Sequence, residues 1–262
     1  MNKLAHVDSL RGIAILLVVF NHVAESIPGL PSVLAGLGYF GKYGVQLFFL
    51  MSAYTLSLSM DSRNDRQPLA AFFIRRYFRI APLYYFGLLL YLLVGLFHFR
   101  SGVETFLPVY TYSPSEILSN VTFLHGLFPS TFTALVPGGW SIGTEMLFYI
   151  LFPAIFQGYA SLRRPVFLFI IPVATAFFLF VFFRALPHVF PPLERHNFEF
   201  YYCSVLNQAP LFLTGISLYF YTTRFDLRSP GPRFAATAAI LGFGAVIVCR
   251  HFGLTDITLA TF

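Results

Sequence analysis

The chain has 262 residues, of which 57% are hydrophobic and 11% are charged, with a net charge of +6. Soluble domains carry about 25% charged residues, so this composition excludes a soluble globular protein and predicts an all-α domain that crosses a membrane several times. The positive charge does not indicate nucleic-acid binding, because the basic residues lie between apolar segments rather than along one face.

The stretch from Asp8 to His22 is an apolar run with a basic residue near each end. Ionisable side chains are costly in hydrocarbon, and they mark functional sites when they occur there. Arg11 and His22 are eleven residues apart, which on a helix brings them within about 20° of the same face, with about 16 Å of rise between them. Asp8 and Glu25 fall on the same stripe. The stretch therefore predicts a groove that is charged at its ends and apolar in its middle.

The same stretch fits two plainer interpretations. A basic start followed by an apolar segment describes a signal peptide, and equally a membrane anchor in which Arg11 reaches the headgroups. No small-residue cleavage site follows the run directly, and Asn21 and His22 interrupt its apolar character. We therefore expect an uncleaved segment, and the stretch alone leaves both the anchor and the groove open.

Apolar segments close to the length of about 20 residues that crosses a bilayer recur along the chain. They lie at 10–27, 43–60, 78–98, 140–158, 165–184, 204–222 and 234–252. With the N-terminus in the cytoplasm, twelve of the seventeen basic residues fall in inner loops and five in outer loops, as the positive-inside rule requires. We therefore predict a single membrane-embedded domain over residues 1–262, with seven spans and the beginning of an eighth at its C-terminus.

The start of the third segment, R-R-Y-F-R-I-A-P, gathers three arginines at the cytoplasmic boundary. Arg76 and Arg79 share a helix face, with Arg75 one turn from Arg79, and Pro82 is expected to kink the helix. One interpretation is a positive-inside signal of the kind that any such junction shows. Clustered guanidiniums also suit a cofactor with a diphosphate, since each makes bidentate, charge-assisted bonds to phosphate oxygens.

The fourth segment begins P-G-G-W-S-I-G-T-E and places Glu145 more than one turn inside the helix. An acid at this depth is a candidate functional residue, and a structural pairing with a histidine or an arginine is the alternative. The predicted topology places Glu145 and His22 in the outer half of the membrane. We therefore expect the two side chains to meet, with His22 as general base and Glu145 as the partner that orients its ring.

Three outer stretches, at 28–42, 98–139 and 187–202, are long enough to carry function. Within the second, the apolar segment 120–129 is too short to cross the bilayer, which predicts an interfacial or re-entrant segment. It contains His125, and a lone histidine there is more often a surface residue than a catalytic one. The seven histidines show no paired ligand spacing, so no metal site is predicted.

Four glycines lead into the second apolar segment, at positions 36, 38, 41 and 44. Small residues let two helices approach each other closely within a membrane. We therefore expect a close helix contact at this point.

Five short motifs follow one another along the chain. They are R-x10-H at Arg11 and His22, G-V-Q-L-F-F-L-M-S-A-Y at 44–54, R-x-x-R at Arg76 and Arg79, N-x-x-F-L-H at 120–125 and W-S-x-x-x-E-x-x-F-Y at 140–149. In this order they resemble the acyltransferase-3 family, bacterial inner-membrane O-acyltransferases that modify envelope polysaccharides and other glycans. The resemblance covers about the first 160 residues, with a weaker similarity at 207–216.

The sequence departs from the family pattern at three positions. Gln46 stands where the family usually has Asp, Ala53 where it has Gly, and Met146 where a second acid often follows the glutamate. Positions 46 and 146 therefore supply no carboxylate. The chain also ends before the usual family core does, so we expect C-terminal spans to be missing from it.

The resemblance implies acyl-CoA, usually acetyl-CoA, as donor and co-substrate, with no permanently bound cofactor. It also implies a carbohydrate acceptor, either lipid-linked or a polysaccharide, in a protein of the bacterial inner membrane surrounded by lipid. The phosphates are expected at the cytoplasmic arginines, the pantetheine arm along the apolar stripe, and the thioester near His22. The predicted site comprises catalytic His22 and Glu145, donor-binding Arg11, Arg76 and Arg79, and substrate-binding Ser52 and His125.

Two other classes of protein stay open from the sequence alone. A secondary transporter for an anionic ligand would also bury charges in the membrane, but its sites usually come from repeated, broken helices, and the chain shows no internal repeat. A non-catalytic membrane protein would not need His22, Glu145 and the arginine cluster together. The O-acyltransferase is therefore the predicted function, and acyl-CoA binding is the property that separates the three classes.

Overall fold

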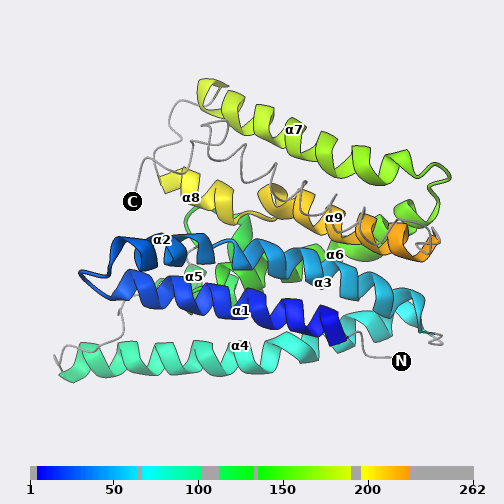
Figure 1. The fold of residues 1–262 in the computed structure, drawn as a ribbon. Coiled ribbons are helices and arrows are strands. Elements are labelled where there is room, and N and C mark those ends of the chain that lie inside the picture. The colour runs from blue at the N-terminus through cyan, green and yellow to red at the C-terminus, as the bar shows by residue number, and fades with distance from the viewer. Residues whose placement is uncertain (1–4, 64–66, 102–111, 133–134, 190–195, 225–262) are drawn as a thin grey trace.

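The computed structural model describes residues 5–63, 67–101, 112–132, 135–189 and 196–224, and every regular element among them is a helix. The elements, shown in Figure 1, are α1 (Ala5–Ser26), α2 (Ser32–Gly41), α3 (Gly44–Asp61), α4 (Pro68–Ser101), α5 (Pro114–Val121), the 3-10 helix η1 (His125–Leu127), α6 (Trp140–Ala160), α7 (Val166–Val189), α8 (His196–Cys203) and α9 (Val205–Arg224). The all-α prediction is thus confirmed for these residues.

The long helices run along one common direction, with their connections at the two ends of the bundle (Figure 1). The start of α1, the end of α3, the start of α4 and the turn between α6 and α7 lie at the same end, whereas the turn between α1 and α2 lies at the other. Arg63 follows the end of α3, and Arg163 and Arg164 belong to the turn between α6 and α7. These described basic residues therefore lie at the end of the bundle where α1 begins, and the orientation of the chain across the membrane stays a prediction.

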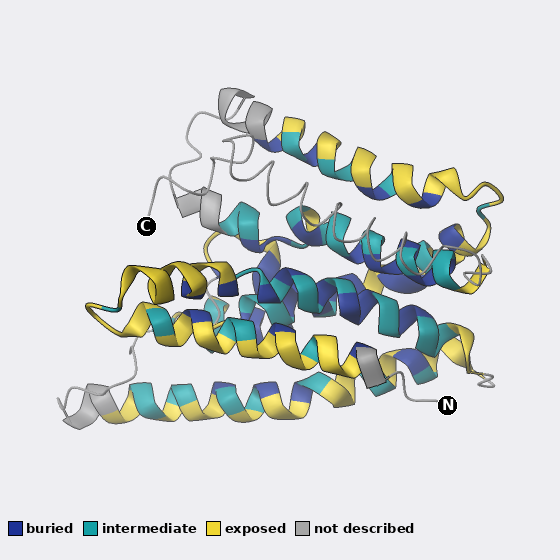
Figure 2. Ribbon diagram, viewed as in Figure 1, coloured by how far each residue is buried: buried dark blue, intermediate teal, exposed yellow. Residues whose placement is uncertain are grey.

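The interior of the bundle lies between α3, α6 and α9. Figure 2 shows buried residues concentrated on these three helices and exposed residues on α1, α2, α4 and α7. Phe49, Phe152 and Phe212 are fully buried, and the rings of Phe148 and Phe212 stack with their centroids 3.9 Å apart. Offset aromatic stacking adds to the energy of burial, so α6 and α9 are held together at the middle of the bundle.

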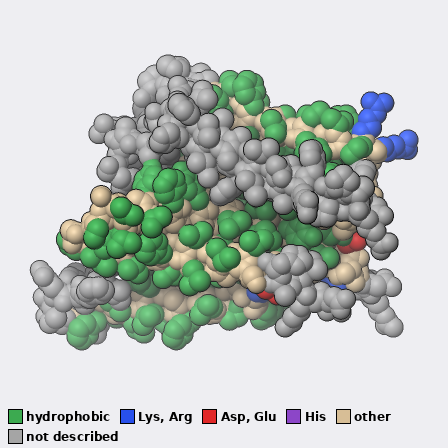
Figure 3. All heavy atoms as spheres, in the orientation of Figure 1, with side chains coloured by type: hydrophobic (Ala, Val, Ile, Leu, Met, Phe, Trp, Pro, Cys, Tyr) green, Lys and Arg blue, Asp and Glu red, His purple; other side chains and the backbone are tan. Residues whose placement is uncertain are grey.

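Four stretches are long and apolar enough to cross a membrane, namely Val7–Ser26, Ser32–Asp61, Pro68–Phe97 and Val166–Phe183. Most of their side chains point outward, and Figure 3 shows apolar side chains over much of one face of the molecule. The segments predicted at 140–158 and 204–222 form α6 and α9. By length and composition, these two helices are not among those apolar enough to cross a membrane.

The predicted count of seven or eight spans is therefore not confirmed. A physical reason for the weak signal of α6 and α9 is their position, because a helix enclosed by other helices can carry polar side chains. Glu145 and Gln208 are two such residues, and both are buried. The segment predicted at 234–252 lies outside the described residues.

Residues 28–42 differ from the outer loop expected for them, since most of this stretch forms α2, which packs along α1. The contact is close because a Cβ at Gly38 would overlap the side chain of Ala24, and one at Gly41 or Gly44 would overlap backbone oxygens of α1. The predicted close approach is thus confirmed at three of the four glycines, whereas Gly36 has open space beside it. Small residues allow this packing in a membrane.

The short segment 120–129 does not cross the bundle, as predicted, and it is anchored by Asn120. The Asn120 side chain is fully buried, and its Oδ1 accepts hydrogen bonds from the Tyr84 hydroxyl at 2.8 Å and from the Leu135 backbone N–H at 3.2 Å. Its Nδ2 donates to the Glu116 carbonyl at 2.8 Å. A buried amide whose bonds are satisfied in this way fixes the loop against α4.

Candidate functional site

An arginine cluster lies between α1 and α4. Arg11 interacts electrostatically with Arg79, and Arg79 and Arg75 both act on Arg76. The guanidinium of Arg11 lies 5.3 Å from the centroid of the Phe48 ring, and that of Arg76 lies 5.8 Å from the centroid of the Phe72 ring. Cation–π contacts of this kind hold a guanidinium in place without occupying its N–H groups.

Glu145 is the carboxylate next to this cluster. It projects from α6, its residue is only 6% exposed, and it acts electrostatically on both Arg11 and Arg76. Its Oε1 accepts a short hydrogen bond from the Ser52 hydroxyl of α3 and another, of 2.6 Å, from the Tyr149 hydroxyl. The structure therefore brings together five of the seven residues predicted for the site.

The charges of the cluster do not balance. Among the described residues, Arg11, Arg76 and Arg79 are accompanied by two carboxylates, Glu145 and the exposed Asp8, which leaves one positive charge in excess. The Nε atoms of Arg11 and Arg76 are buried and have no hydrogen-bond partner among the described residues. Unpaired guanidinium N–H groups with excess positive charge are suited to an anionic ligand that accepts bidentate hydrogen bonds.

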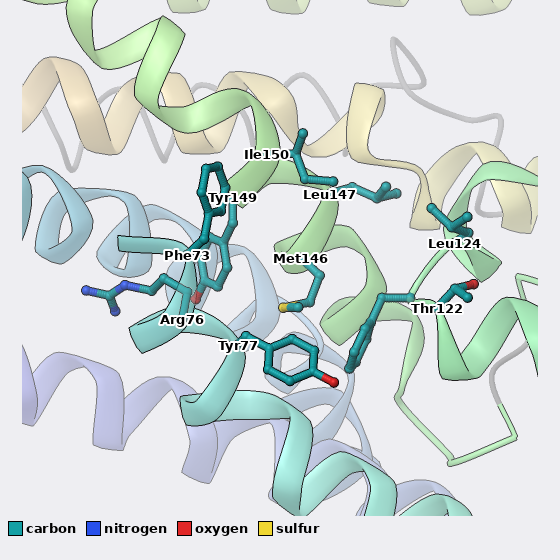
Figure 4. Close-up of a pocket in the computed structure, with 10 residues that line it drawn as sticks. Phe73, Arg76, Tyr77, Thr122, Leu124, Met146, Leu147, Tyr149 and Ile150 are labelled. Atoms are coloured by element: carbon teal, nitrogen blue, oxygen red, sulfur yellow. The ribbon is translucent and has the colours of Figure 1, made fainter. Parts of the chain in front are cut away.

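An apolar cavity of about 220 Å³ adjoins the cluster. Its walls come from α4, α6 and the residues after α5, and they are formed by Phe73, Arg76, Tyr77, Thr122, Phe123, Leu124, Met146, Leu147, Tyr149 and Ile150. In Figure 4 the guanidinium of Arg76 points away from Met146 and Tyr77. The positive charge is thus directed out of the cavity, whose lining is otherwise almost entirely apolar.

His22 lies away from the cluster, toward the other end of α1. Its side chain is 65% exposed, and its Nδ1 lies 3.7 Å from Oε2 of Glu25, one turn further along the helix. Glu25 also accepts a hydrogen bond of 2.6 Å from the Asn21 amide. The pairing expected between His22 and Glu145 is not observed, because Glu145 is bonded to Ser52 and Tyr149 instead.

His125 is completely buried, so the expectation of a surface histidine is wrong. Its Nε2 lies 3.2 Å from the Gly139 carbonyl oxygen, and its ring stacks on Tyr84 with centroids 6.1 Å apart. Burial lowers the pKa of His125 below its ordinary value, although the carbonyls of Gly139 and Ser119 favour the protonated ring. Burial therefore favours the neutral imidazole, and no hydrogen bond of full geometry reaches its Nδ1 among the described residues.

Replacing Gly143 with alanine should destabilise the protein, because the added Cβ would overlap the His125 ring. That ring cannot shift freely, since it is stacked on Tyr84 and bonded at Gly139. Overpacking of this kind costs about 1–3 kcal/mol, measurable as a lower unfolding temperature in detergent. Gly158 of the same helix has open space beside it, so Gly158→Ala should leave stability unchanged or raise it. Equal stabilities for the two variants would contradict this packing.

A family model for an acyltransferase domain, Acyl_transf_3, matches residues 4–261. The chain belongs to the acyltransferase-3 family. Its apolar helices agree with membership of a family of membrane acyltransferases. A search of curated proteins and a search of solved structures give no significant match.

The positions at which this acyltransferase-3 protein departs from the family pattern have defined partners. Gln46 donates a hydrogen bond of 2.8 Å from its Nε2 to the Tyr202 hydroxyl. Ala53 is fully buried and faces Gly215 of α9, and Met146 lines the cavity. No group of three His, Cys, Asp or Glu side chains that could hold a metal occurs in the described part of the chain.

Sequence reasoning missed Tyr149 as a site residue. It lies four residues after Glu145, a spacing that places both side chains on one helix face, and it falls within the W-S-x-x-x-E-x-x-F-Y motif. The helical spacing alone could have identified it. Glu25 falls on the same stripe as His22 in the sequence, and the structure places its carboxylate beside the imidazole.

Proposed function

We propose that this acyltransferase-3 protein transfers an acyl group from acyl-CoA to a hydroxyl of a carbohydrate acceptor at the bacterial inner membrane. The proposed acyl group is acetyl. The observation that supports this proposal is the arginine cluster, which combines an excess of positive charge with the buried, unpaired Nε atoms of Arg11 and Arg76. CoA carries a diphosphate and a ribose phosphate, and the oxygens of these groups accept bidentate hydrogen bonds from guanidiniums. With the N-terminus in the cytoplasm, the cluster faces the compartment that supplies acyl-CoA.

His22 is the general base of the proposed reaction. Its imidazole is accessible, whereas that of His125 is completely enclosed. His22 takes the proton of the acceptor hydroxyl as the oxygen attacks the thioester carbonyl carbon. The carbon–sulfur bond then breaks, and the CoA thiolate leaves and recovers the proton. Glu25, rather than Glu145, is the carboxylate that stabilises the imidazolium formed in between, because it lies beside the ring.

The function is tested by measuring binding of acetyl-CoA to the purified protein in detergent. Arg76→Ala and Arg79→Ala should each weaken binding by about 1.5–3 kcal/mol, or about 10- to 160-fold, because each removes charge-assisted hydrogen bonds. Arg76→Lys should recover part of the loss, since lysine restores the charge but not the planar fork. In the unaltered protein, release of free CoA thiol should be measurable when a hydroxyl acceptor, or water in its place, takes the acetyl group.

Arg164 provides the matched control. It is an exposed arginine in the turn between α6 and α7, at the same end of the bundle as the cluster. Arg164→Ala should therefore leave the affinity for acetyl-CoA unchanged. If Arg76→Ala and Arg79→Ala both bind acetyl-CoA with unaltered affinity, these arginines do not bind the donor. Their charge would then serve only to orient the chain in the membrane.

A further inference from the structure

We propose that Ser52 and Tyr149 are positioning residues that hold the Glu145 carboxylate back from the arginines, so that Glu145 balances their charge without occupying their N–H groups. This inference rests on the proposed function, since the groups kept free are those that bind the donor phosphates. It gives Glu145 a role at the donor site in place of the one expected for it beside His22.

The first step of the argument is the way in which the carboxylate is held. Ser52 and Tyr149 both donate to the same oxygen, Oε1 of Glu145, from two different helices. Hydrogen bonds to an ionised group are about twice as strong as neutral ones. Tyr149 is itself buried within the aromatic core, and the centroid of its ring lies 6.3 Å from the centroid of the Phe72 ring. The carboxylate is therefore fixed by groups that cannot move easily.

The second step is the relation of Glu145 to the arginines. The carboxylate acts electrostatically on Arg11 and Arg76, but no ion pair within 4.0 Å joins it to an arginine of the described residues. Consistent with this, no hydrogen-bond partner of either arginine's Nε atom occurs in the part of the chain that the structure describes. Glu145 thus offsets the mutual repulsion of the guanidiniums, which is strong in a medium of low dielectric constant, and leaves their donors unoccupied.

The third step is what would follow if the restraint were removed. A free carboxylate beside unpaired guanidiniums would turn toward them, because a bidentate Arg–carboxylate pair is among the strongest side-chain contacts. It would then occupy the N–H groups that the donor phosphates require, and it would compete with the donor. Ser52 and Tyr149 therefore set the affinity of the site without touching the ligand.

The inference is tested by measuring the affinity for acetyl-CoA in single and double variants. Tyr149→Phe and Ser52→Ala should each raise Kd about 3- to 10-fold, the range expected for one lost hydrogen bond, and Ser52→Thr should retain affinity. Glu145→Gln should not weaken binding, because the guanidinium N–H groups are already unoccupied and a neutral amide cannot form an ion pair with them. In the Glu145→Gln background, Tyr149→Phe should then have no further effect on Kd.

The double variant separates positioning from a merely structural role. If Tyr149 served only to stabilise the fold, Tyr149→Phe would weaken binding equally with Glu and with Gln at position 145, and the inference would be overturned. Tyr159 of the same helix is buried and accepts a hydrogen bond from Ser217, so Tyr159→Phe controls for loss of a buried hydroxyl and should leave Kd unchanged. Failure of the unaltered protein to bind acetyl-CoA would instead count against the proposed function.

Discussion

Replacing His22 with alanine should lower the rate of acyl transfer by about 10²- to 10⁴-fold, the range expected when a general base is removed. Binding of acetyl-CoA should be unaffected, because His22 is eleven residues from Arg11 and makes no contact with the arginine cluster in the described structure. The measurement compares turnover at saturating acetyl-CoA with the affinity determined separately. Proton transfer belongs to the chemical step, so kcat should fall without a change in Kd.

Two further variants sharpen the assignment of His22. Glu25→Gln should lower turnover by a smaller factor, because it removes the charge next to Nδ1 and leaves the imidazole in place. Glu145→Gln should leave turnover at saturating donor close to normal, since Glu145 is bonded to Ser52 and Tyr149 and not to His22. A His22→Ala protein that acylates its acceptor at the normal rate would exclude His22 as the base.

The sequence was sufficient to identify most residues of the proposed donor site. Arg76 and Arg79 share a face by helical spacing, and Arg11 and Glu145 are ionisable residues in apolar segments, which is costly without a partner. The structure places all four, together with Ser52, in one region between α1, α3, α4 and α6. Composition and periodicity report these features directly, because they depend on residues that lie close together in the sequence.

The level of Glu145 along the bundle could not be predicted in the same way. Periodicity gives the face and the length of a helix, but it does not say how far one helix is shifted along another. Gly44, the first residue of α3, packs against Ala14 and Val18 of α1, so α3 begins halfway along α1. Glu145 is bonded to α3 and therefore lies near Arg11 rather than near His22.

The burial of His125 could not be predicted from sequence patterns either. The segment that carries it is short and apolar, which predicts a position at the membrane surface. Its burial depends on contacts with residues distant in the sequence, including the Tyr84 ring and the space left open at Gly143. A histidine becomes a core residue when such partners enclose it, and these partners are fixed by the tertiary fold.

The contact between α3 and α9 links the fold to the proposed donor site, and a substitution there should have a large effect. A Cβ at Gly215 would overlap the Leu50 carbonyl oxygen and approach the side chain of Ala53. The backbone of α3 cannot yield without moving Ser52, which is adjacent to Ala53. Gly215→Leu should therefore destabilise the protein by about 3 kcal/mol and weaken acetyl-CoA binding, because Ser52 would be drawn away from Glu145.

The measurement combines the unfolding temperature in detergent with the affinity for acetyl-CoA. Gly36→Leu is the control, since Gly36 also lies in a helix and has open space beside it, and it should change neither quantity greatly. Adding Glu145→Gln to Gly215→Leu should restore acetyl-CoA affinity without restoring stability, because the freed carboxylate is then absent while the overlap with α3 remains. Recovery of both quantities, or of neither, would show that the contact of α9 with α3 does not act on the donor site through Ser52 and Glu145.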